Sequence, residues 1–141
     1  MTIHAMPNTI TLPPATSLPD ELARALAQGS PLVVMVSLEG CPFCKIVRES
    51  YLAPLRQDQR LPVVQVDMRS QRSVKNFNGM GTTHQALIAA WRTDVAPTVL
   101  FFGRQGVEVA QRLVGGYIPD FYGAYLSERL ETARRALTKA V

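Results

Sequence analysis

The feature that most constrains the fold is an unbroken apolar segment that ends at a pair of cysteines. Residues 31–38 read PLVVMVSL, with Gly29-Ser30 before them and Glu39-Gly40 after them. A short apolar run that is rich in β-branched residues and bounded by turn residues is typical of a strand buried on both faces of a sheet. We therefore expect this segment to be a central strand.

A helix is expected to begin directly after this strand, at Cys41. From Cys44 onward, apolar side chains recur at every fourth position: Val47, Tyr51 and Leu55. Pro42 fits a helix start, because an N–H in the first turn has no partner within the helix. Pro54 lies further along and is expected to bend or end the helix.

The rest of the chain shows the same two periodicities. Ser17 precedes an apolar stripe at helical spacing that stops before Gly29, and Thr82 or Thr83 is placed to cap another helix. We expect further strands over 61–67, 97–102 and 107–114, an irregular loop over 68–82 and a last helix over 119–139. His84, near the start of its helix, is expected on the surface or as a capping residue. This order predicts an α/β fold with a mixed central sheet and helices on both faces.

Length and composition exclude several classes of protein. The chain has 141 residues, of which 47% are hydrophobic and 18% charged, so we expect a single folded domain over 17–141 after an irregular arm over 1–16. The net charge of +4 comes from scattered basic residues, which gives no reason to expect nucleic-acid binding. The apolar runs are too short to span a membrane, and residues 1–18 show no secretory signal, although the mature end of an exported protein would look the same.

The two cysteines, Cys41 and Cys44, lie within one turn of the predicted helix. A disulfide between them closes a very small loop and would stabilise the fold little, so a purely structural role is a weak explanation. A structural zinc site would also need His4 and His84 as ligands. At the helix start, unpaired N–H groups and the helix dipole lower the pKa of the Cys41 thiol. These features predict that Cys41 is the nucleophile and that Cys44, one turn further in, resolves the mixed disulfide.

Charged and aromatic residues surround this pair. Lys45 and Arg48 are interpreted as surface charges, with support of the Cys41 thiolate or docking of an acidic partner as the alternative. Glu39 opposes stabilisation of the Cys41 thiolate, because a nearby anion raises the pKa of a thiol. Phe43 follows Pro42 on the exposed turn, and we expect it to contact an extended or unfolded partner.

Three features in order resemble the thioredoxin superfamily over residues 30–138, with the first helix extending the resemblance to residue 18. The strand leads into Cys41-Pro42-Phe43-Cys44, Val95-Ala96-Pro97-Thr98 leads into a strand–turn–strand, and Val114-Gly115-Gly116 precedes the last helix. The resemblance implies a three-layer sandwich with an extra N-terminal helix. It also implies a cis peptide bond at Pro97 that faces Cys41. The substrate-binding residues would then be Pro42, Phe43, Ala96 and Pro97.

The implied activity is that of a protein thiol–disulfide oxidoreductase, with no cofactor or metal, acting as a monomer with protein substrates and an unidentified redox partner. As the location of the protein, the bacterial periplasm is favoured slightly over the cytoplasm. Met35 stands where thioredoxins carry a buried Asp, and together with the Pro-Phe pair it predicts a disulfide that is more oxidising than that of thioredoxin.

Two alternatives to this activity stay open. One is a glutaredoxin-like enzyme, since Cys-Pro-Phe-Cys and Gly115-Gly116 followed by Asp120 resemble that family. The other is a non-catalytic binding module, favoured by Met35 and the 68–82 insertion.

Overall fold

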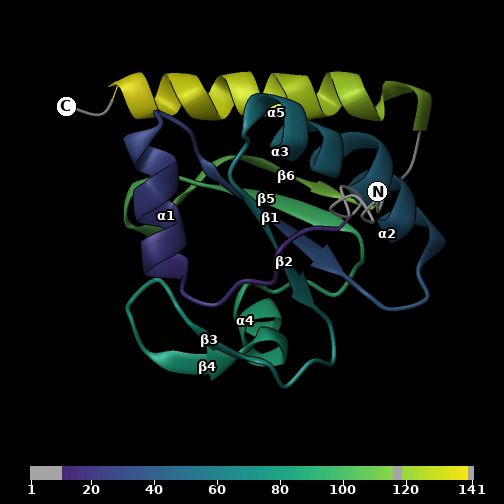
Figure 1. Ribbon diagram of the computed structural model, residues 1–141, viewed down its shortest axis with the longest axis vertical. Helices are drawn as coiled ribbons and strands as arrows, with labels where there is room; N and C mark the ends of the chain where they lie inside the picture. The colour runs from purple at the N-terminus through teal and green to yellow at the C-terminus, as the bar shows by residue number, and fades with distance from the viewer. Residues whose placement is uncertain (1–10, 116–118, 140–141) are drawn as a thin grey trace, which may run out of the picture.

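A four-stranded mixed sheet forms the centre of the protein (Figure 1). The computed structural model describes residues 11–115 and 119–139. The strands are β1 (Leu32–Ser37), β2 (Val63–Asp67), β5 (Thr98–Phe102) and β6 (Glu108–Val114), and they lie in the order β2-β1-β5-β6. β1 and β2 are parallel, as expected for a helical crossover, whereas β5 and β6 are antiparallel to their neighbours.

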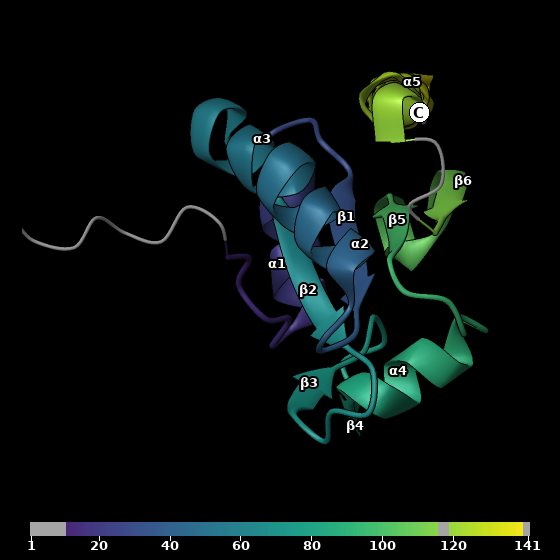
Figure 2. The same cartoon turned by 90° about the vertical axis from the view of Figure 1, so that its right-hand side faces the viewer.

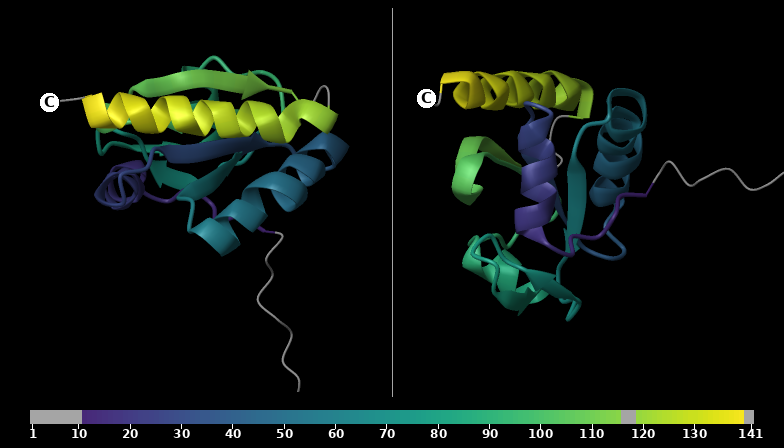
Figure 3. Two further views of the ribbon diagram at one scale, coloured as in Figure 1. Left: turned by 90° about the horizontal axis from the view of Figure 1, so that it is seen from above. Right: turned by 60° about the vertical axis from the view of Figure 1, so that its left-hand side comes forward.

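Helices cover both faces of this sheet, which confirms the predicted three-layer arrangement. Successive side chains of a strand point to opposite faces, so Val33 and Met35 belong to one core cluster while Val34 and Val36 belong to the other. The first face packs against the cysteine-bearing helix and α5 (Pro119–Lys139), which lies along β6 (Figure 3). The second face packs against α1 (Leu18–Ala27) and α4 (His84–Ala90).

The helix that begins after Cys41 runs to Gln59 and contains a wider turn. It consists of α2 (Pro42–Ile46), a π-helical segment (Val47–Leu52) and α3 (Ala53–Gln59). Pro54 has no N–H and lies in the first turn of α3, directly after the π segment, where the Ala53 N–H donates to the carbonyl of Arg48. The helix therefore does not end at Pro54, because the π turn accommodates the proline.

The region over 68–82 is more ordered than the sequence predicts. It contains an antiparallel hairpin of β3 (Ser73–Lys75) and β4 (Gly81–Thr83), which lies beside α4 at one end of the molecule (Figure 2). Asn76 stabilises the turn, because its Oδ1 accepts 3.0 Å hydrogen bonds from the N–H groups of Asn78 and Met80. Each strand is only three residues long, too short to show the alternation from which a strand is predicted.

Residues 11–17 form an N-terminal strap across this end of the fold. The Ala15 N–H donates to the Gln65 carbonyl at 2.9 Å, and the Lys75 N–H donates to the Thr16 carbonyl at 3.0 Å. Leu12 and Ala15 are buried, one in each core cluster. Residues 1–10 of the predicted arm lie outside the described part. Within that part, no helix combines the length and apolar character needed to cross a membrane.

Candidate active site: the Cys41–Cys44 turn

The two cysteines are joined by a disulfide at the start of α2. Their Cα atoms are 5.2 Å apart, and the Cys44 N–H lies 3.1 Å from the Sγ of Cys41, which acts as the helix cap. Cys41 is partly exposed, whereas Cys44 is 1% exposed and belongs to the core cluster that contains Met35. The structure therefore leaves Cys41 partly exposed to solvent and encloses Cys44.

The segment before β5 lies against Cys41 although it is distant in sequence. The Sγ of Cys41 is 3.7 Å from the carbonyl oxygen of Ala96, a residue 55 positions away, and the Ala96–Pro97 peptide bond is cis, as the resemblance implied. Pro97 is buried and Ala96 partly exposed. Pro42 and Phe43 are exposed, with 49% of Phe43 accessible to solvent. The fold thus brings all six residues named from the sequence to one end of the sheet.

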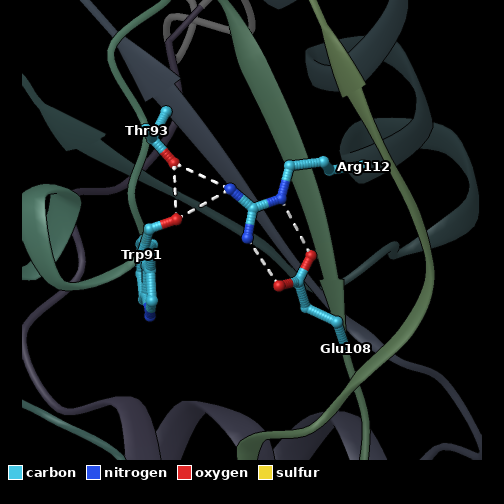
Figure 4. A network of polar contacts seen from close by, with 4 residues as sticks. All are labelled: Trp91, Thr93, Glu108 and Arg112. Carbon is cyan, nitrogen blue, oxygen red and sulfur yellow. Dashed lines mark hydrogen bonds and ion pairs between the residues drawn. The ribbon is translucent and has the colours of Figure 1, made fainter.

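A polar network holds Trp91 and Thr93, which precede Ala96 and Pro97 in the chain (Figure 4). The Nη1 of Arg112 on β6 donates to the carbonyl of Trp91 at 2.8 Å and to the Oγ1 of Thr93 at 3.1 Å. The same guanidinium forms a two-pronged ion pair with Glu108. Sequence reasoning did not identify Arg112; its only sequence signal is its position four residues from Glu108, on the same side of a strand.

A cavity of about 1050 Å³ opens beside Cys41, and neither Ala96 nor Pro97 is among the residues that line it. It lies over β1 and β2, and its wall includes Cys41, Arg48, Gln65 and Asp67. No sequence pattern indicated it, because its lining comes from the strap, two strand ends, the loop after β2 and the cysteine-bearing helix.

His84 contradicts its expected surface or capping position. It is completely buried, and the cap of α4 is Thr83. The Nδ1 of His84 accepts from the Asp67 N–H at 3.2 Å, and its Nε2 lies 2.9 Å from the Ala15 carbonyl. The tautomer that donates through Nε2 and accepts at Nδ1 satisfies both contacts. His84 therefore links the strap to the end of β2, next to the cavity.

Residues 18–129 match the thioredoxin-like domain family, and this match covers most of the chain. The chain belongs to the thioredoxin superfamily. Trxlp from Edwardsiella tarda has a similar solved structure, with 22% identity, a TM-score of 0.54 and coverage of 82% of this chain and 98% of its own. Thioredoxin from Thermus thermophilus matches with 22% identity, 86% coverage of both chains and a TM-score of 0.54. A poplar thioredoxin h matches with 18% identity, 81% and 95% coverage and a TM-score of 0.53. A comparison with curated protein sequences found no significant match.

Within this superfamily, a thioredoxin-like fold that holds Cys41 and Cys44 at disulfide distance supports a role in thiol–disulfide exchange. This thioredoxin-like protein departs from thioredoxins at Met35, which is completely buried where they carry an acid. The glutaredoxin alternative depends on Gly116 and on the side chain of Asp120, both of which lie outside the described residues, as does His4.

Proposed function

We propose that this protein is a protein-disulfide oxidoreductase that exchanges electrons with substrate disulfides and dithiols through Cys41 and Cys44. The observation that carries the proposal is the position of the Cys41 sulfur. It caps a helix, belongs to a partly exposed residue and lies 3.7 Å from the carbonyl oxygen of Ala96. A thiolate at a helix start is stabilised by the N–H groups of the first turn, which favours its use as a nucleophile and as a leaving group.

In the reductive direction, the Cys41 thiolate attacks one sulfur of a substrate disulfide. A new S–S bond forms, and the second substrate sulfur leaves as a thiolate that takes a proton from water. The Cys44 thiol then loses its proton to water, and its thiolate attacks the Sγ of Cys41, which releases the first substrate sulfur as a thiolate and forms the Cys41–Cys44 disulfide. Two electrons have passed to the substrate, and an external dithiol reduces the pair again by the same exchange. Starting from the oxidised pair, the reverse steps oxidise a substrate dithiol.

The surroundings of Cys41 fit an extended polypeptide substrate. Phe43, Val95 and Val114 are 49%, 40% and 40% exposed, so apolar side chains from α2, the segment before β5 and the end of β6 are available for contact. The carbonyl of Pro97 accepts from the Gly115 N–H at 2.7 Å, which ties this segment to the end of β6. In this proposal, Ala96 and Pro97 align the substrate backbone, and Pro42 and Phe43 contact its side chains.

Serine variants of the two cysteines test the proposal. With dithiothreitol as reductant, the acceleration of insulin reduction above the rate of dithiothreitol alone should be lost in Cys41→Ser, because the remaining cysteine, Cys44, is only 1% exposed. Cys44→Ser should accumulate a mixed disulfide between Cys41 and the substrate, visible by mass spectrometry and removed by excess reductant. Tyr125→Ser, which changes an exposed residue on α5, is the matched control and should retain the wild-type rate. If the double serine variant reduces insulin as fast as the wild type, the proposal is wrong.

A further inference from the structure

The cavity beside Cys41 is separate from the segment that carries Ala96 and Pro97. β1 has β2 on one side and β5 on the other, and the cavity lies over the β2 side. Its wall comprises the ends of β1 and β2, the loop over 68–70, the strap at Thr11 and Leu12, and the first turns of the cysteine-bearing helix. A molecule that reacts at Cys41 can therefore extend into this space.

Three cations and two anions line the cavity: Lys45, Arg48 and Arg69 against Glu39 and Asp67. Lys45 and Arg69 are exposed, and Arg48 is partly buried. No ion pair found among residues 11–115 and 119–139 involves any of these three cations. The cavity thus carries an excess of positive charge next to the reactive sulfur.

Arg48 is the cation best placed to use this charge. Its Nη1 donates at 3.2 Å to the Oγ of Ser37 and at 3.2 Å to the Oε1 of Gln65, both neutral acceptors. Gln65 in turn donates from Nε2 to the Oδ1 of Asp67 at 2.8 Å, so this amide lies between the guanidinium and the carboxylate of Asp67. These contacts hold Arg48 in place, and because both acceptors are neutral they do not cancel its positive charge. A guanidinium has five N–H donors, so donors beyond these two bonds are left for a ligand.

We propose that this cavity binds a carboxylate of the disulfide substrate, with Arg48 as its principal partner, so that the protein prefers acidic disulfides. A charge-assisted hydrogen bond to a partly buried guanidinium is stronger than one between neutral groups, which gives the pairing its selectivity. The proposal rests on the proposed function, because it assigns a substrate class to the same site. The carboxylate can belong to an acidic residue beside the disulfide of a polypeptide or to a small anionic disulfide.

The test measures how fast the reduced protein is oxidised by substrates of different charge. One pair consists of disulfide-bonded peptides that differ only by Glu or Gln next to the cysteine. The other pair is glutathione disulfide and the neutral hydroxyethyl disulfide. The single-turnover rate constant is followed at low ionic strength by quenched thiol labelling of Cys41.

Wild-type protein should react about tenfold faster with the acidic member of at least one pair, and the pair that shows the preference identifies the source of the carboxylate. Arg48→Gln should bring the ratio close to one, whereas Arg48→Lys should keep most of it. Arg56→Gln makes the same charge change in α3, at a residue that lines a different cavity, and should leave the ratio unchanged. Added salt should reduce the wild-type ratio.

Equal rates within both pairs for the wild type would overturn the inference while leaving the proposed function intact. A ratio that persists in Arg48→Gln would also overturn it, because an effect of Arg48 on the Cys41 thiolate alone lowers both rates equally. If the reduced wild-type protein reacts with none of the four disulfides, the proposed function fails and the inference fails with it.

Discussion

Replacing Arg112 with Met should loosen the segment that carries Ala96 and Pro97 while leaving the cysteine pair itself unchanged. Methionine keeps an unbranched apolar side chain but removes every hydrogen bond of the guanidinium. The change therefore breaks the ion pair with Glu108 and the bonds to Trp91 and Thr93. Since Trp91 and Thr93 lead directly into the segment before β5, we expect that segment to lose one of its anchors to β6, while the bond between the Gly115 N–H and the Pro97 carbonyl remains.

The expected loss of stability follows from the exposure of these groups. The side chains of Arg112 and Glu108 are 25% and 35% exposed, so solvent screens the ion pair and its contribution is about 0.5–1 kcal/mol. The two further hydrogen bonds contribute about 0.5–1 kcal/mol each. The sum is about 2 kcal/mol in the free energy of unfolding. For a chain of this size, this corresponds to a decrease in Tm of about 6 °C.

Urea unfolding and a thermal scan of Arg112→Met measure this loss, and Glu108→Gln is the matched control. The control removes only the ion pair, so it should cost about 0.5–1 kcal/mol and leave the reaction rate with a peptide disulfide unchanged. Arg112→Met should slow that reaction while the potential of the Cys41–Cys44 pair stays the same. If Arg112→Met unfolds at the wild-type urea concentration, or reacts as fast as Glu108→Gln, the anchoring role is wrong.

Two further predictions concern the cysteine pair and the buried histidine. The reduction potential of the Cys41–Cys44 pair, measured against a glutathione buffer, should be less negative than the value of about −270 mV typical of thioredoxin. The reasons are that the start of α2 stabilises the reduced thiolate and that Met35 supplies no buried base. A potential at or below that of thioredoxin, about −270 mV, would refute this prediction. His84→Leu should lower the free energy of unfolding by about 2–4 kcal/mol, since the buried Ala15 carbonyl and Asp67 N–H lose their partner. An unchanged urea midpoint for His84→Leu would show that these two bonds contribute nothing.

Local patterns predicted the elements that build the framework of the site. The run over 31–38 contains β1 (Leu32–Ser37), and the last helix spans Pro119–Lys139, the residues that its apolar period indicates. The cap of α1 at Ser17 and the start of α2 at Cys41 also follow from residue type alone. These features are predictable because burial of one helix face or of a whole strand requires apolar side chains at regular spacing.

The sequence by itself therefore determined the fold class, the position of Cys41 at a helix start and the motif at Pro97. The tertiary structure alone decided that His84 is buried, that Arg112 anchors the segment before β5 and that a cavity lined by Arg48 opens beside Cys41. The reason is that each of these depends on hydrogen bonds or walls contributed by residues far apart in the chain. Periodicity reports which side of an element is buried, but it carries no information about which polar groups meet across elements.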